Sequence, residues 1–178
     1  RPDRYQEAYR TMLAAHPMKK AVVADDHLLI RAGVRLLLES VGVQVVCEAG
    51  DGDQLIAAYD LHRPDILVID VAMPRKTGLQ ALAEIRKRSS AVIAIVVSNL
   101  ESADAVNLAF NCGANAYLVK DFALPELQQA LQATMRGDKY LSPRITSHVL
   151  AGNGGDGSSG TLTARQLEIL RLIADGNT

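Results

Sequence analysis

The sequence predicts an α/β fold in which a doubly wound, five-stranded parallel sheet carries helices on both faces. The first observation is a set of short apolar runs of strand length, such as Ile66, Leu67, Val68 and Ile69. An uninterrupted apolar run is typical of a strand buried on both faces, as in a parallel sheet covered by helices. The second observation is that these runs alternate with segments of helical periodicity, which indicates five successive β-α units.

Taken in order, the strands are expected at residues 21–24, 43–47, 66–69, 91–97 and 116–119. The helices are expected at residues 28–40, 53–61, 78–88, 102–111 and 125–135. Residue types at the boundaries support these assignments. Gly113 is a C-cap glycine after the fourth helix, and Pro125 lies in the first turn of the fifth.

Polar side chains follow four of the apolar runs directly. Asp25 and Asp26 follow the first strand, Asp70 the third, Ser98 the fourth and Lys120 the fifth. In an open parallel sheet these positions meet at the carboxyl edge, where ligands bind at the switch point of the strand order. Acids after strands one and three fit the flavodoxin-like order 2-1-3-4-5, so we expect all five side chains to converge.

This set of side chains suits phosphoryl transfer to a carboxylate. Three aspartates held at one point repel each other, and a divalent cation offsets that cost. An all-oxygen site favours Mg²⁺, which keeps several waters and accepts a phosphate oxygen. Lys120 supplies a compact positive charge for an anion, and Ser98 supplies a hydroxyl donor. Aspartate is a known covalent nucleophile, which makes Asp70 the candidate acceptor.

The residues at these strand ends, with a few of their neighbours, resemble the motifs of a known family. The Asp25-Asp26 pair, Asp70 followed by Met73-Pro74 and Gly78, Ser98, and the run at 113–120 are similar to the receiver domain of bacterial two-component response regulators. The resemblance covers about residues 19–136. It implies that Asp70 is the phospho-acceptor and that Lys120 contacts the phosphoryl group.

The same resemblance implies the remaining roles. Asp26 would ligate Mg²⁺ directly, Asp25 would assist through water, and the Ala72 carbonyl would be another ligand. Ser98 and Tyr117 would form the conformational switch. Simpler interpretations exist, because Asp25-Asp26 could cap the following helix and Tyr117 could serve packing alone. We expect His27 to be an exposed side chain, and Arg75-Lys76 to be either a kinase contact or solvated loop charges.

The chain divides into four parts. Residues 1–17 are an N-terminal extension, either an amphipathic helix or an added segment, and residues 18–137 form the receiver. Residues 138–160 combine a short helix, with Ser142 as N-cap, and a Gly/Ser-rich linker. Residues 161–178 resemble the opening helix of a LuxR-type helix-turn-helix domain, which places the chain in the NarL/FixJ class. The recognition helix does not follow, so DNA is expected to bind through the full-length C-terminal domain and not through this chain.

The composition is that of an ordinary globular protein. The 178 residues are 48% hydrophobic and 22% charged, with a net charge of −1, so no basic footprint for nucleic acid or membrane is evident. No apolar stretch is long enough to span a membrane, and no secretory signal opens the chain. Cys47 and Cys112 lack metal-like spacing, and we expect buried thiols in a cytoplasmic protein.

These features predict a phosphorylation-controlled transcription regulator. Its partners would be a sensor histidine kinase and, on activation, a second copy of itself. It would not be an enzyme beyond weak self-phosphorylation and self-dephosphorylation. One alternative is a receiver that binds partners without phosphorylation, since Asn99 and Asp121 depart from the family pattern. A remote alternative is a metal-dependent phosphohydrolase, although Ala72 stands where such an enzyme needs a second acid.

Overall fold

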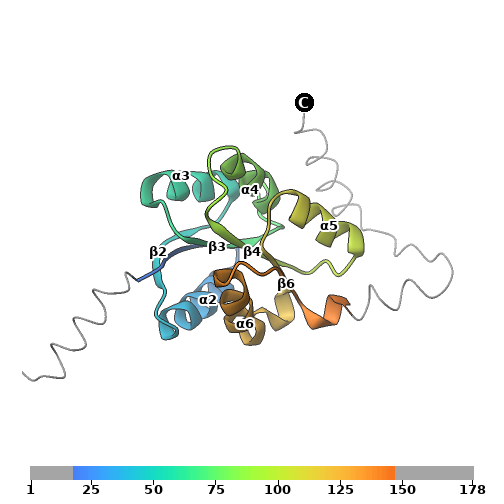
Figure 1. Ribbon diagram of the computed structural model, residues 1–178. Helices are drawn as coiled ribbons and strands as arrows, with labels where there is room; N and C mark the ends of the chain where they lie inside the picture. Colours follow the sequence, from blue (N-terminus) through green and yellow to red (C-terminus); the bar gives the residue numbers. More distant parts are fainter. Residues whose placement is uncertain (1–17, 147–178) are drawn as a thin grey trace, which may run out of the picture.

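The computed structural model describes residues 18–146, which form a six-stranded parallel sheet with helices on both faces (Figure 1). The strands are β1 (Lys20–Ala24), β2 (Gln44–Ala49), β3 (Ile66–Asp70), β4 (Ile93–Ser98), β5 (Ala116–Val119) and β6 (Tyr140–Leu141). The helices are α2 (Leu28–Ser40), α3 (Gly52–His62), α4 (Gly78–Arg86), α5 (Ala103–Asn111) and α6 (Ala123–Met135), with a 3₁₀ turn at Lys120–Phe122. The extension at 1–17, the linker beyond residue 146 and the segment at 161–178 lie outside the described residues.

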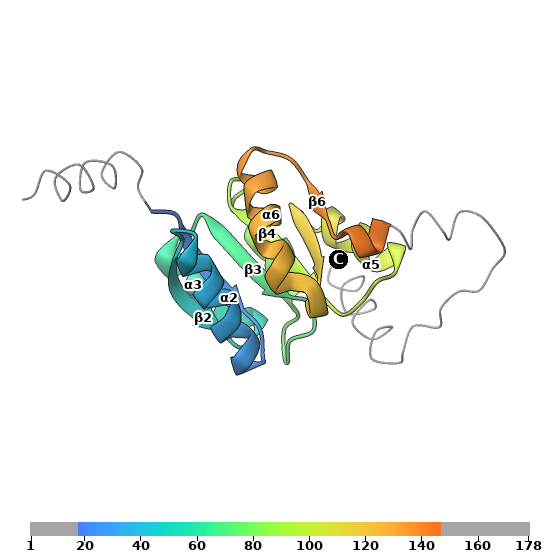
Figure 2. The ribbon, with the colours of Figure 1, turned by 90° about the horizontal axis from the view of Figure 1, so that it is seen from below.

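The strand order is β2-β1-β3-β4-β5-β6, and every neighbouring pair is parallel. The predicted doubly wound, flavodoxin-like arrangement is therefore confirmed. Alternate residues of each strand enter two cores, since successive side chains point to opposite faces. In β3, Ile66 and Val68 pack with α2 and α6, while Leu67 and Ile69 pack with α3, α4 and α5. Figure 2 shows α2 and α6 lying along one face of the sheet.

The prediction of five strands was wrong by one. Residues 140 and 141 were expected to lead into a short helix, but they form β6, in which Leu141 pairs with Tyr117 of β5. Helical geometry begins at residue 143, which agrees with the prediction of Ser142 as N-cap, and the predicted end of this helix near Leu150 lies outside the described residues. The Ser142 hydroxyl donates to Glu126 of α6 at 3.1 Å, so its side chain ties the segment to the receiver.

Helix starts follow the side-chain signals in the sequence. Thr77 and Gln80 form a capping box at α4, and the hydroxyl of Ser102 accepts from the N–H of Ala105 at α5. Gly113 has a φ of +95°, which agrees with its prediction as a C-cap glycine. Within residues 18–146, no helix is long and apolar enough to cross a membrane.

The structure also tests the expectation for the two cysteines. Cys47 and Cys112 are free and only partly buried, where full burial was predicted. Both pack against the edge of the core that α3, α4 and α5 cover. The Lys120–Asp121 bond is trans, as are all peptide bonds in the described part of the chain.

Candidate functional site

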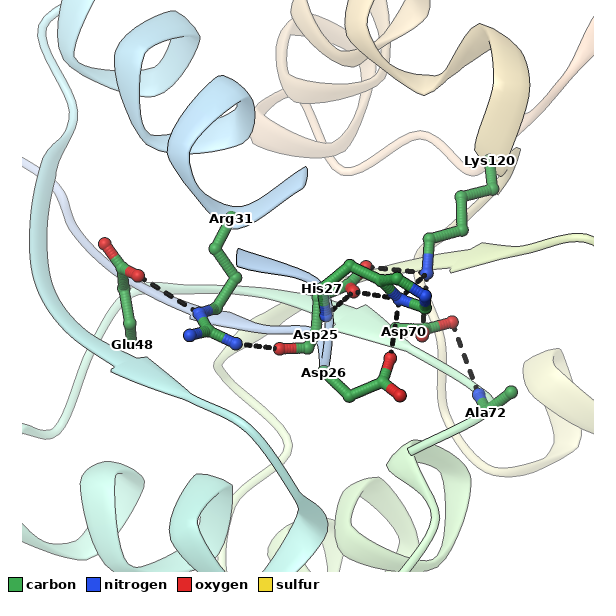
Figure 3. A network of polar contacts seen from close by, with 8 residues as sticks. All are labelled: Asp25, Asp26, His27, Arg31, Glu48, Asp70, Ala72 and Lys120. Atoms are coloured by element: carbon green, nitrogen blue, oxygen red, sulfur yellow. Dashed lines mark hydrogen bonds and ion pairs between the residues drawn. The ribbon is translucent and has the colours of Figure 1, made fainter. Parts of the chain in front are cut away.

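The carboxyl edge of the sheet brings three predicted site residues into direct contact. Asp25 directly follows β1, Asp70 is the last residue of β3, and Lys120 directly follows β5. The ammonium of Lys120 lies 2.9 Å from Asp25 Oδ2 and 2.9 Å from Asp70 Oδ2 (Figure 3). Because β1, β3 and β5 all end at this edge, three distant parts of the sequence build one pocket. The convergence expected from the strand ends is therefore present for these residues.

Two of the three acidic groups of the pocket are buried. Asp25 and Asp70 are each 3% exposed, so their charges are poorly solvated. Burial raises the pKa of Asp70 above its ordinary value, and the charge of Asp25 acts in the same direction. The hydrogen bond and charge of Lys120 oppose this rise without cancelling it. A carboxylate with a raised pKa is more basic, which favours its use as a nucleophile.

Lys120 remains a cation in this setting. Burial alone lowers its pKa, but its hydrogen bonds and charge interactions with Asp70 and Asp25 outweigh burial, and the net direction is upward. The ammonium thus offsets the repulsion between two buried carboxylates. Its position beside Asp70 is also where it would meet an anionic group attached to that carboxylate.

Asp26 and His27 line the open side of the pocket. His27 is exposed, as predicted, but its Nδ1 lies 2.7 Å from Asp26 Oδ1 and 3.2 Å from Asp25 Oδ1. One ligand atom from each of Asp25, Asp26, His27 and Asp70 lies within 4.8 Å of the others. Three carboxylates in one cluster fit a hard divalent cation with oxygen ligands. Ala72 donates its backbone N–H to Asp70 Oδ1 at 3.3 Å, so its peptide adjoins the same cluster.

Ser98 and Tyr117 are linked through one residue of the loop after β4. The Ser98 hydroxyl oxygen accepts from the N–H of Leu100 at 3.1 Å, and the Tyr117 hydroxyl donates to the carbonyl of Leu100 at 2.8 Å. Both side chains are buried. Burial raises the pKa of Tyr117 to about 12. The Tyr117 side chain therefore lies inside the domain in this structure.

Two arginine contacts near the pocket were not predicted from the sequence. Arg31 of α2 donates to the backbone carbonyl of Asp25, a contact for which no local sequence pattern exists. Arg75 was considered a kinase contact or a solvated charge; its side chain is 67% exposed, and it also pairs with the buried carboxylate of Asp51 at the start of α3. The φ of Arg75 is +64°, an uncommon conformation for a residue with a Cβ. The loop after Asp70 is thereby fastened to α3.

Comparisons with known proteins give a consistent result. The family model described as "Response regulator receiver domain" matches residues 21–132. The transcriptional regulatory protein PdtaR of Mycobacterium tuberculosis is 37% identical over 114 residues, covering 64% of this chain and 55% of that protein's length. The transcriptional regulatory protein LiaR of Bacillus subtilis is 30% identical over 166 residues, covering 90% of this chain and 79% of LiaR.

A similar solved structure is that of a LuxR-family two-component response regulator from Aurantimonas sp. SI85-9A1. It superposes with a TM-score of 0.72 at 29% identity, covering 78% of this chain and 99% of that one. Both the sequence and the shape of the described residues are thus similar to those of regulators.

Proposed function

This chain belongs to the response regulator receiver family, and from that premise we propose that Asp70 accepts a phosphoryl group from a sensor histidine kinase. Response regulators of this kind are signalling proteins in transcription control. The observation that carries the assignment is the position of Asp70: a buried carboxylate at the end of β3, 2.9 Å from the Lys120 ammonium. Asp65, just before the same strand, also lies near a lysine ammonium, 3.3 Å from Lys19, but its side chain is 41% exposed and therefore solvated.

The transfer is a displacement at phosphorus. A carboxylate oxygen of Asp70 forms the new O–P bond while the P–N bond to the kinase imidazole breaks, and the imidazole leaves with the bonding electron pair. Lys120 offsets the negative charge of the transferred group at the carboxylate it already contacts. Desolvation of Asp70 keeps its carboxylate basic enough to attack.

Receiver domains generally bind Mg²⁺ at an acidic pocket, and the described residues contain such a cluster. We infer that Asp25, Asp26 and Asp70 would hold the ion, with the Ala72 carbonyl as a further ligand. When bound there, Mg²⁺ would supply positive charge for the phosphoryl oxygens. The donor set supports this choice, because carboxylates and a carbonyl are ligands that Mg²⁺ prefers.

The response of the domain would pass through Ser98 and Tyr117. A phosphoryl oxygen on Asp70 would attract the Ser98 hydroxyl, whose oxygen now accepts from Leu100 N–H. Because Tyr117 donates to the carbonyl of the same residue, a shift of Leu100 reaches Tyr117 directly. Phosphorylation would thus stabilise one arrangement of the loop after β4 and favour a homodimer. DNA would be bound by the full-length C-terminal domain.

The proposal is tested with the full chain, Mg²⁺ and beryllofluoride, a phosphoryl mimic, followed by light scattering. We expect Mg²⁺-dependent uptake, which Asp70→Asn removes while the fold is kept. Asp65→Asn is the matched control, because it makes the same change at the exposed end of β3 and should leave uptake intact. Absence of uptake by the unaltered chain would favour the phosphorylation-independent binding module, and steady turnover of a phosphomonoester would favour the hydrolase.

A further inference from the structure

The guanidinium of Arg31 joins three separate elements beside the acidic pocket. Arg31 belongs to α2, and its Nε donates to Glu48 Oε2 of β2 at 3.1 Å. Its Nη1 donates to the backbone carbonyl of Asp25, in the turn between β1 and α2. Figure 3 shows Arg31 between Glu48 and Asp25, on the side of the pocket away from Lys120. The Arg31 side chain is only 13% exposed, so these bonds form in a largely dry setting.

The carbonyl that Arg31 holds belongs to the peptide connecting Asp25 to Asp26. On its other side, Asp25 is fixed by its own N–H, which donates to the Ala49 carbonyl at 3.0 Å. Its carboxylate is also engaged, because Asp25 Oδ1 accepts from the N–H of His27 at 2.7 Å. The contact from Arg31 holds the carbonyl of the Asp25–Asp26 peptide itself and so restrains the rotation of that peptide. That rotation determines where the Asp26 carboxylate points relative to Asp25.

The arrangement acts through geometry more than through charge. Glu48 offsets the charge of Arg31, so the pair adds little net positive potential to the pocket. Glu48 is itself held by Arg35, whose Nη1 lies 3.1 Å from Glu48 Oε1. Arg35 is 48% exposed and shares Glu48 with Arg31, but its hydrogen bonds go to Glu39 and Glu48 and not to the Asp25 turn. It is therefore a matched comparison for Arg31.

We propose that Arg31 is a positioning residue for divalent-cation binding: it orients the Asp25–Asp26 peptide so that both carboxylates face one ion. The inference rests on the proposed function in one respect, which is that the acidic pocket is the cation site. A planar guanidinium reaches two acceptors in fixed directions, whereas an ammonium is a point charge on a flexible stem. Replacing Arg31 by lysine thus keeps the charge and removes the simultaneous contact with Glu48 and the Asp25 carbonyl.

The test is calorimetric titration of the full chain with magnesium chloride alone, alongside thermal melting of each variant. We expect Arg31→Gln and Arg31→Lys both to weaken Mg²⁺ binding about tenfold or more, as seen when groups that orient metal ligands are removed. Arg35→Gln should leave the affinity unchanged, because an exposed ion pair contributes little. Glu48→Gln, a milder change that leaves Arg31 in place, should weaken binding to a smaller extent.

Three results would overturn the proposal. Arg31→Gln with unchanged Mg²⁺ affinity and a lower melting temperature would make Arg31 purely structural. Arg31→Lys with unaltered affinity would mean that charge, and not orientation, is what Arg31 contributes. An equal loss of Mg²⁺ affinity in Arg35→Gln and Arg31→Gln would mean that any contact holding α2 in place supports binding. If the Arg31 variants do not fold, unaltered Mg²⁺ affinity in Glu48→Gln would likewise contradict the positioning role of Arg31. Failure of the phospho-acceptor proposal is seen separately, as absence of beryllofluoride uptake by the unaltered chain at saturating Mg²⁺.

Discussion

Gly78, the first residue of α4, packs directly against the carbonyl group of Asp70. A Cβ at Gly78 would overlap the Asp70 carbonyl oxygen and the Ile69 side chain. The backbone N–H of Gly78 also donates to the Val71 carbonyl at 3.1 Å. The start of α4 is thus pressed onto the strand end that carries the candidate phospho-acceptor. The absence of a side chain at residue 78 is what permits this approach.

We expect Gly78→Ala to destabilise the protein by about 2–4 kcal/mol, because the obstacle is backbone that cannot rotate away. Beryllofluoride uptake should fall as well, since Asp70 must shift. Gly33→Ala in α2 is the control: its nearest neighbour is the flexible Leu124 side chain, and alanine favours a helix interior. Urea unfolding of both variants checks this, and equal stabilities would contradict the expected role of Gly78.

Lys120→Met should destabilise the protein by about 3 kcal/mol at neutral pH in the absence of Mg²⁺, because it leaves two buried carboxylates without their cation. Without Lys120, the pKa of Asp70 rises further above its ordinary 3.8. The folded variant then holds a proton that the unfolded chain has lost, so its stability falls as the pH rises from about 4. Acidification should partly restore the melting temperature.

Lys87→Met is the matched control for that experiment, because Lys87 is exposed at the end of α4. Its melting temperature should follow that of the unaltered protein at every pH. A Lys120→Met variant that is as stable as Lys87→Met would show that the pocket carboxylates are neutralised by something other than Lys120.

The raised pKa of Tyr117 predicts that the protein loses stability at alkaline pH. Its pKa is raised from 10 to about 12, so the unfolded chain loses the phenolic proton before the folded chain does. Stability is therefore fully present below pH 10 and decreases by about 3 kcal/mol as the pH approaches 12. Tyr117→Phe should reduce this slope and cost about 1 kcal/mol at neutral pH, from the lost bond to Leu100. Lys120 also has a raised pKa, so the difference between the two proteins isolates Tyr117.

The burial of Ile145 predicts that the receiver needs the residues after position 137 for its stability. Its side chain is fully buried in the same core as Tyr117. Ile145→Ala should cost about 3 kcal/mol, the usual effect of emptying a core position. Leu61→Ala, at a side chain that is 77% exposed, should change the stability little. Chemical unfolding compares the two, and a small effect at Ile145 would contradict its assignment to the core.

Much of the fold could be predicted because the local signals agree with the tertiary structure. The uninterrupted apolar runs locate β1, β3, β4 and β5 to within two residues, since strands buried on both faces need no polar positions. The contact of Lys120 with Asp25 and Asp70 follows from the topology, because parallel strands end at one edge. Residue types and strand ends were sufficient for these features.

The remaining features depend on contacts between distant residues. The two-residue strand β6 is defined by pairing with β5, while the local Ser142-Pro143 signal indicates only the helix that begins at residue 143. Arg31 and Glu48 belong to different elements, and nothing in either segment indicates that they meet. The Arg75–Asp51 pair is similar, because Asp51 caps α3 and its cationic partner lies 24 residues further along the chain.

The sixth strand has a consequence for protein engineering. Because β6 continues the receiver sheet and Ile145 fills its core, the segment after residue 137 is a fixed part of the domain. Arg144 adds a contact of 3.0 Å with Glu101 in the loop after β4. A chimeric regulator in which this receiver is fused to a foreign output module should therefore be joined after Thr146. A junction at residue 137 would remove an edge strand and open the core beside Tyr117.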